Sequence, residues 1–187
     1  ADFQLKTVAP GSLATIFGTG FGLAGATATM GGAQATVLFQ NSTQLNVLVP
    51  ASIAGQTSVL VVVNANGQNS PPATVPLNSF EPGIFANGVL NQDNSLNSKT
   101  HPAAPGSVIQ IFATGLSGQG NIQAKIGDTP VAKLQYAGPA PNLVGVQQVN
   151  LPIPPSTSAG PIAISVCGGT EWFAGVCSAP YTVYTGN

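Results

Sequence analysis

Charged side chains are scarce in this sequence. They make up 5% of its 187 residues, against about 25% in an ordinary soluble domain. Arginine is absent, and the four lysines are spread along the chain as Lys6, Lys99, Lys125 and Lys133. Binding to a nucleic-acid backbone requires clustered Lys and Arg side chains, and attraction to an anionic membrane surface requires the same. We therefore predict that the protein binds no nucleic acid and no charged membrane surface.

Long hydrophobic runs are also missing. No stretch of about 18 or more apolar residues occurs, so the sequence predicts no transmembrane helix. The N-terminus shows no basic segment followed by an apolar core, and we interpret Ala1 as the start of a mature or trimmed chain. A signal peptide would then lie upstream of it. The expected location is extracellular or on the cell surface.

Residues that commonly carry catalysis are few. A catalytic triad needs a His oriented by a carboxylate, and a glycosidase needs two carboxylates across a cleft. The one His, His101, lies in a loop-like segment, and the five acids are scattered as Asp2, Glu81, Asp93, Asp128 and Glu171. The oxygen-rich stretch 91–95 is more typical of a polar turn than of a weak Ca²⁺ site. We expect no enzyme, no catalytic residue, no cofactor and no metal site.

Only two cysteines are present, Cys167 and Cys177, ten positions apart in a glycine-rich segment. This spacing favours a disulfide that closes a hairpin, which would imply export to an oxidising compartment. The alternative is a pair of free thiols in a cytosolic sheet protein. A zinc site would need a second pair of ligands, which the sequence does not offer.

The low charge also bears on association. The net charge is −1, and no charged residue lies between Lys6 and Glu81. Solubility of a monomer normally draws on net charge, so the surface must be covered by Ser, Thr, Asn, Gln and Gly instead. Such a surface loses little hydration energy when it meets a copy of itself. We expect self-association into an oligomer or a filament.

One motif occurs twice. The tetrapeptide APGS at 9–12 leads into IFGTG at 16–20, and APGS at 104–107 leads into IFATG at 111–115, 95 positions later. Pro-Gly-Ser is typical of a tight turn, because Pro presets φ and Gly accepts a positive φ. A repeat at this distance predicts two modules of one fold.

Short apolar or alternating runs recur about every ten residues, and no helical period is present. We expect strands at 2–8, 12–18, 26–30, 33–39, 43–49, 57–63 and 73–77, and then at 107–113, 122–126, 131–136, 146–151, 161–167 and 181–184. The β-branched run 57–63 suits a strand buried on both sides. Segment 78–103 is either a linker or a linker that also supplies the first strand of the second module. The pattern is typical of two β-sandwiches, residues 1–78 and residues 79–187.

These motifs resemble a known family. The repeated APGS motif, NQD and LNS within 91–98, and YAGPAP, QVN and PIP within 136–154 are similar to a domain of unknown function. That domain stands at the C-terminus of many exported proteins of Solibacter and other Acidobacteria. The resemblance covers essentially the whole chain and implies an exported, all-β protein of two tandem Ig-like (IPT/TIG-type) β-sandwich domains. It supplies no catalytic or ligand residues.

The N-terminal segment is one candidate contact. Sheet edges are usually guarded by charge in soluble proteins, yet the strand-like segment that holds Phe3, Leu5 and Val8 has only Asp2 and Lys6 beside it. We expect it to join subunits by adding to a neighbour's sheet. The C-terminal segment 181–184 is a second candidate, and the alternative is that each segment stays in its own sheet.

The loop between the cysteines is the other candidate contact. Glu171, Trp172 and Phe173 lie there, and an exposed aromatic pair could stack on a sugar or dock on a neighbour. The alternative is that the aromatic rings fold back onto the sandwich. The favoured function is an exported, non-catalytic structural or adhesive surface protein, a self-assembling filament subunit. The alternative is a carbohydrate-binding module with a glycan partner that uses the Trp172 loop.

Overall fold

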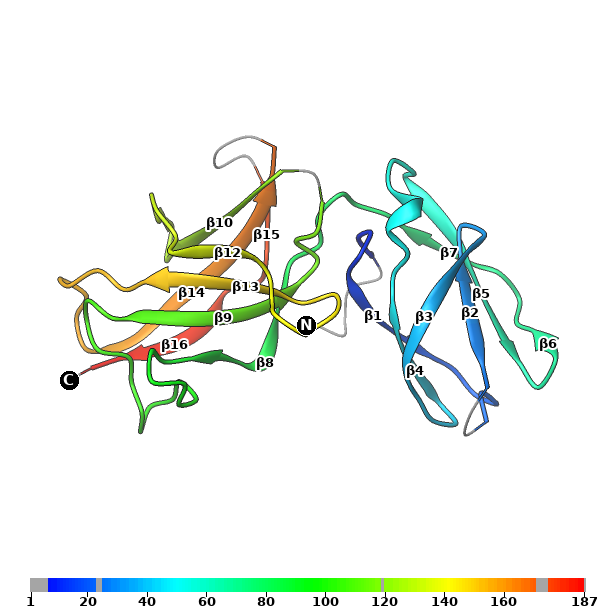
Figure 1. The fold of residues 1–187 in the computed structure, drawn as a ribbon, viewed down its shortest axis with the longest axis horizontal. Coiled ribbons are helices and arrows are strands. Elements are labelled where there is room, and N and C mark those ends of the chain that lie inside the picture. Colours follow the sequence, from blue (N-terminus) through cyan, green and yellow to red (C-terminus); the bar gives the residue numbers. More distant parts are fainter. Residues whose placement is uncertain (1–6, 23–24, 119, 171–174, 187) are drawn as a thin grey trace.

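The computed structural model describes residues 7–22, 25–118, 120–170 and 175–186 (Figure 1). Almost all regular structure in these ranges is β-strand, apart from one turn of 3-10 helix, η1 (Ala51–Ile53). The strands form two modules that follow one another along the long axis of the molecule (Figure 1), and each module has its own hydrophobic core. The expected all-β fold of two tandem Ig-like β-sandwich domains is confirmed. Within the described ranges, no helix has the length and hydropathy of a membrane span.

The first module folds seven strands into two layers. β1 pairs with β4 and β4 with β3, whereas β5 pairs with β2, β6 and β7. β3 belongs to both layers, because its first half pairs with β2 and its second half with β4, with a bulge between Val37 and Phe39. The strands are β1 (Leu13–Phe17), β2 (Thr27–Met30), β3 (Ala33–Gln40), β4 (Gln44–Leu48), β5 (Ser58–Ala65), β6 (Gln68–Asn69) and β7 (Ala73–Pro76).

Alternation along the strands builds the first core. Leu45 and Val47 of β4 are fully buried and face Val61 of β5 across the sandwich core. The expectation that run 57–63 is buried on both sides is wrong, since Leu60 is 54% exposed. The strand alternates instead, because only one face of its layer packs against the other layer. A glycine hairpin turn connects β2 and β3 at Gly31 and Gly32, with φ of 57° and 81°.

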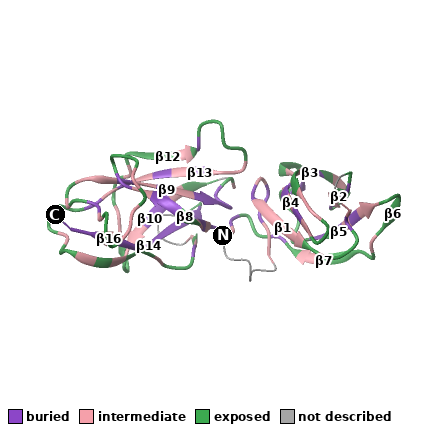
Figure 2. Ribbon diagram, turned by 90° about the horizontal axis from the view of Figure 1, so that it is seen from below, coloured by how far each residue is buried: buried purple, intermediate pink, exposed green. Residues whose placement is uncertain are grey.

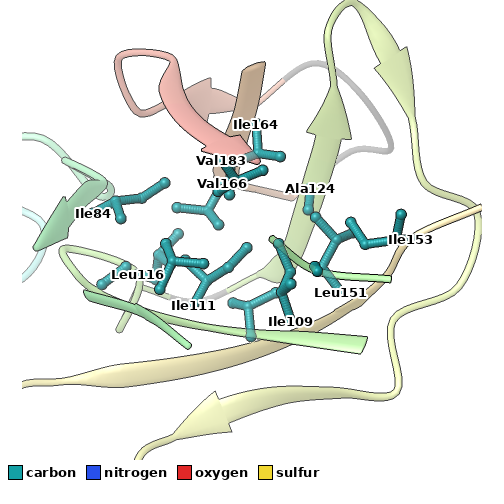
Figure 3. Packing of buried hydrophobic residues seen from close by; sticks show 14 residues of the cluster. Ile84, Ile109, Ile111, Leu116, Ala124, Leu151, Ile153, Ile164, Val166 and Val183 are labelled. Atoms are coloured by element: carbon teal, nitrogen blue, oxygen red, sulfur yellow. The ribbon is translucent and has the colours of Figure 1, made fainter. Parts of the chain in front are cut away.

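The second module repeats the plan with nine strands. One sheet has the order β11-β10-β14-β15, with β16 also on β14, and the other has the order β12-β13-β9-β8. The core lies between them (Figure 3). The strands are β8 (Gly83–Leu90), β9 (Val108–Thr114), β10 (Asn121–Ile126), β11 (Thr129–Pro130), β12 (Tyr136–Pro139), β13 (Gln147–Pro152), β14 (Gly160–Gly169), β15 (Val176–Cys177) and β16 (Tyr181–Thr185).

The two APGS turns are built alike. Ser12 Oγ donates to Ala9 O at 2.7 Å, and Ser107 Oγ donates to Ala104 O at 2.6 Å. The residue just before each turn makes a parallel bridge to the last strand region of its own module, Val8 to Leu77 and Ala103 to Thr185. The sequence repeat is therefore a structural repeat with the same 95-residue offset.

Segment 78–103 is ordered by hydrogen bonds. It supplies β8, as expected, and the loop after β8 is fixed by Asn97, whose Nδ2 donates to Tyr184 O at 2.9 Å. Phe80 is buried at 5% exposure against the second module, where its ring fills the space beside Gly118 and Gly168. This packing supports the module boundary that we propose between residues 78 and 79.

One expected strand is absent. Residues 131–136 have no ladder of their own, and the neighbouring strand β12 begins only at Tyr136. Val131 and Leu134 nevertheless pack against the second core as partly buried side chains. The prediction of a strand over 131–135 was wrong, although the Val131 N–H still donates to Ala124 O of β10 at 2.9 Å.

Candidate functional site

A groove opens in the first module between β1 and β7, which belong to its two different layers. Its volume is about 400 Å³. Met30 and Val61, both part of the first core, reach its floor, while Ile16 of β1 and Val75 of β7 line opposite walls. Figure 2 shows β1 and β7 next to one another along one side of the module. The groove is thus an opening into the hydrophobic core between the two sheet layers.

The described residues that line the groove carry little charge. Among the described residues that line it, Glu81 is the one that carries a charge. The Glu81 carboxylate accepts a hydrogen bond from Asn78 Nδ2 at 2.9 Å, and its backbone N–H donates to Gly115 O at 3.0 Å. Apolar walls with a single carboxylate suit an apolar occupant, because little charge has to lose its hydration on binding.

One end of the groove lies where the two modules meet. Thr114 of β9 is 4% exposed and lines this end. Its Oγ1 accepts a hydrogen bond from the backbone N–H of Leu13 and donates to Gly145 O, both at 2.8 Å. A Cβ on Gly145 would come within 2.8 Å of the Leu13 side chain, so the second module approaches the first closely here. The junction fixes this end of β1.

The first described residues of the chain also lie at this end of the groove. Thr7 and Val8 line the groove. The Val8 N–H donates to Pro76 O at 3.2 Å, and Val8 O accepts from the Asn78 N–H at 3.0 Å. Val8, one of the three residues expected to join subunits, is therefore anchored beside β7 of its own module.

Several expected contact residues lie outside the described residues. These are Phe3 and Leu5 of the N-terminal segment and Glu171, Trp172 and Phe173 of the cysteine loop. Val8 lines the apolar groove. Nothing in the sequence had indicated this groove. The C-terminal candidate strand is β16, which pairs with β14 of its own module over Tyr181–Thr185.

The cysteine prediction is confirmed. Cys167 of β14 and Cys177 of β15 are directly opposite in the antiparallel pair and form a disulfide with an S–S distance of 2.04 Å. Among the residues that the structure describes, no group of three or more His, Cys, Asp or Glu side chains could hold a metal ion. His101 is exposed in the loop after β8.

The polar stretch 91–95 forms a turn. Asp93 Oδ1 accepts hydrogen bonds from the Ser95 hydroxyl at 2.7 Å and from the Ser95 N–H at 3.0 Å. These two bonds stabilise the carboxylate, so the pKa of Asp93 lies below its ordinary value of 3.8. The stretch belongs to the second module and has no part in the groove.

Sequence reasoning missed the role of Thr114. It belongs to the second copy of the repeated motif, and its counterpart Thr19 in the first copy is exposed. The repeated motif therefore places a threonine at the same position in both modules. Only the arrangement of the two modules in space determines that Thr114, and not Thr19, is buried at the junction.

A family model gives the class of the first module. Residues 4–76 match the IPT/TIG domain, so an IPT/TIG Ig-like domain occupies this part of the chain. No curated protein matches the sequence.

The solved structures that this chain matches are of low similarity. A protein of the mixed-linkage glucan utilization locus of Bacteroides ovatus, SGBP-B, solved with a mixed-linkage heptasaccharide, is 15% identical with a TM-score of 0.47; the match covers 98% of this chain and 43% of that one. A γ-CGTase from alkalophilic Bacillus clarkii is 13% identical with a TM-score of 0.37, over 96% of this chain and 24% of that one. The I9–I11 tandem of titin is 10% identical with a TM-score of 0.32, over 96% and 62%. This chain thus spans less than two thirds of each of these structures.

Proposed function

We propose that the protein is an exported, non-catalytic structural or adhesive surface component that assembles into filaments by β-strand addition. The strand that joins subunits is the N-terminal segment with Phe3 and Leu5, and its receptor is the groove of a neighbouring copy. Val8 anchors the segment to its own module. Membership in the exported acidobacterial family that the sequence resembles is part of the same proposal.

The observation that carries this proposal is the open apolar groove. It measures about 400 Å³ and reaches the buried side chains of Met30 and Val61. An exposed apolar opening of this kind is typical of a binding site. The segment before Thr7 alternates apolar and polar residues, and this pattern predicts that Phe3 and Leu5 share one face when the segment is extended.

The energetics predict assembly that depends on concentration. Burial of the Phe3 and Leu5 side chains contributes about 3–6 kcal/mol, and each main-chain hydrogen bond adds about 0.5–1.5 kcal/mol. Association costs about 4–15 kcal/mol in lost translational and rotational freedom. One strand therefore joins two copies with modest affinity, and a filament forms above a threshold concentration.

Charge does not oppose this contact. No charged residue lies between Lys6 and Glu81, so β1 and its neighbours carry none of the lysines that usually prevent edge-to-edge association. The disulfide fits a protein that functions outside the reducing cytoplasm.

The test is light scattering of the chain of residues 1–187 over a concentration series, with a matched pair of variants. Phe3→Ala removes about 2 kcal/mol of burial, which should raise the threshold concentration for assembly roughly 30-fold. Gln4→Ala changes the other face of the same segment and should shift the threshold less than about threefold. Equal thresholds for the two variants, or a wild-type chain that stays monomeric at every concentration, would contradict the proposal.

A further inference from the structure

The sheet β12-β13-β9-β8 of the second module has one face towards the core and one face towards solvent. Val149 and Leu151 of β13 are completely buried in the core. Gln148 and Asn150 alternate with them and therefore lie on the solvent side, which we call the outer face. No residue of these four strands carries a charge. The outer face thus suits a neutral partner, because no charge has to lose its hydration on binding.

The edge strand β12 places an aromatic ring on the outer face. In the antiparallel pair of β12 and β13, Tyr136 lies opposite Asn150, and Gly138 lies opposite Gln148. Residues opposite each other in such a pair share one face of the sheet. Tyr136 is 40% exposed, and Figure 2 shows β12 on the outside of the second module. The ring is therefore open to a partner from solvent.

Gly138 allows the Tyr136 ring to lie along its own strand. The Tyr136 hydroxyl donates a hydrogen bond to Pro139 O at 2.6 Å, so the side chain extends along β12 and passes over Gly138. A Cβ on Gly138 would come within 3.1 Å of the Tyr136 hydroxyl oxygen and within 3.3 Å of Cζ. A larger residue at this position would thus lift the ring. With glycine, one side of the ring rests on the strand and the other side faces solvent.

Two amide groups beside the ring are held in fixed orientations. Gln148 Nε2 donates to Asn150 Oδ1 at 2.8 Å and to Gln110 Oε1 at 3.3 Å. Within the described residues, no hydrogen bond occupies Gln148 Oε1 or Asn150 Nδ2. An amide oxygen accepts hydrogen bonds and an amide nitrogen donates them. The outer face therefore presents one acceptor and one donor next to the flat ring.

The first module carries a related arrangement. Gln44 Nε2 donates to Asn46 Oδ1 at 2.7 Å, as Gln148 does to Asn150. Phe39 lies opposite Asn46, in the position that Tyr136 takes opposite Asn150, and it is 48% exposed. The bonded amide pair with an aromatic neighbour thus belongs to the repeated fold. The glycine two residues after the aromatic residue is found in the second module alone, since the first module has Asn41 there.

We infer that the outer face of the second module binds a neutral, β-linked glycan through Tyr136, Gln148 and Asn150. The C–H face of a pyranose ring is apolar and packs on a flat aromatic ring, and the sugar hydroxyl groups both donate and accept hydrogen bonds. Tyr136 supports the sugar ring, Gln148 Oε1 accepts from one hydroxyl group, and Asn150 Nδ2 donates to another. A second copy of the chain fits less well, because close packing of two sheets favours apolar side chains over amides.

This site is separate from the other contacts considered for the chain. β14 and β15, which hold the two cysteines, belong to the other sheet of the second module. The groove that receives a strand in the proposed assembly lies in the first module. Glycan binding therefore adds a ligand to the adhesive role, and it does not depend on filament formation.

The first test is a titration with cellohexaose, xylohexaose and mannohexaose below the assembly threshold, followed by the side-chain amide NMR signals. The signals of Gln148 and Asn150 should shift saturably with at least one of the three glycans. The Gln40 amide is the control, because its two ends already bond to Phe21 O and to the Ala26 N–H in the first module. Its signals should not shift.

A set of variants tests the flat ring. Tyr136→Ala removes the ring and should raise the Kd of the glycan roughly tenfold or more. Gly138→Ala keeps the ring but lifts it from the strand, and it should have a similar effect. Both changes lie on the outer face of an edge strand, so the fold should persist, as checked by circular dichroism. Leu60→Ala removes an exposed side chain of the first module and should change the Kd less than about twofold.

Three results would overturn the inference. The first is the absence of a saturable shift with all three glycans. The second is an unchanged Kd for both Tyr136→Ala and Gly138→Ala, which would place the glycan elsewhere on the chain. The third is a raised assembly threshold for Tyr136→Ala while the wild-type chain binds none of the glycans, which would assign the outer face to contact between copies.

Discussion

Thr114→Val should loosen the junction between the two modules. The Thr114 hydroxyl accepts from the Leu13 N–H and donates to Gly145 O, each at 2.8 Å, and the residue is 4% exposed. Valine has nearly the same shape but cannot form either bond. The Leu13 N–H would remain beside an apolar methyl group, which costs about 1–3 kcal/mol.

The magnitude follows from these two bonds. We expect a loss of about 2 kcal/mol in the free energy of unfolding, and a fall in Tm of about 4–8 °C for a chain of this size. Thr114→Ser retains the hydroxyl and loses one methyl group, so it should cost about half as much. Urea denaturation followed by circular dichroism measures both variants. A Thr114→Val protein within about 0.5 kcal/mol of wild type would refute the view that this hydroxyl joins the modules.

Four further predictions concern other parts of the chain. Gly168→Ala should destabilise the second module by about 1–3 kcal/mol, because a Cβ there would overlap the Phe80 ring; in a Phe80→Ala background the same change should cost much less, as measured by a double-mutant cycle. Removal of the Cys167–Cys177 disulfide should cost about 3 kcal/mol, from the closure entropy of a loop of this length, as measured by denaturation with and without a reductant. Because folding lowers the pKa of Asp93, the Asp93 carboxylate stabilises the folded protein above its pKa in the unfolded chain, and this stabilisation is lost as the pH falls through its pKa in the folded protein. Asp93→Asn should therefore make the free energy of unfolding depend less on pH in that acidic range. An unchanged pH dependence would contradict this. Trp172 fluorescence should not change saturably with soluble polysaccharides, and a saturable change would favour the glycan-binding alternative over assembly.

The regular parts of the fold were predictable from local patterns. The APGS repeat indicated two equivalent modules, and each copy folds into the same turn, with Ser12 and Ser107 making the same bond. Turn residues and alternation predicted most strands, because these signals act over a few residues. The disulfide followed from two cysteines in one hairpin-like segment.

The groove could not be predicted in this way. Whether β1 has a second partner depends on a strand from elsewhere in the chain or from another molecule, and no local pattern in 13–17 records it. Ile16 and Ile111 have the same identity and the same place in the repeat, yet one is half-buried and the other completely buried. The strand predicted at 131–136 is missing for a similar reason, since Val131 and Leu134 pack against the core of their own module without belonging to a strand.

The most direct test of the account is electron microscopy of the chain of residues 1–187 at increasing concentration, beside a chain that lacks residues 1–6. The deletion leaves Val8 and its bonds to Pro76 and Asn78 in place, so the truncated protein should fold, as checked by circular dichroism. We predict regular filaments from the complete chain and dispersed monomers from the truncated one. Equal filaments from both chains, or none from either at any concentration, would contradict assembly through the N-terminal strand.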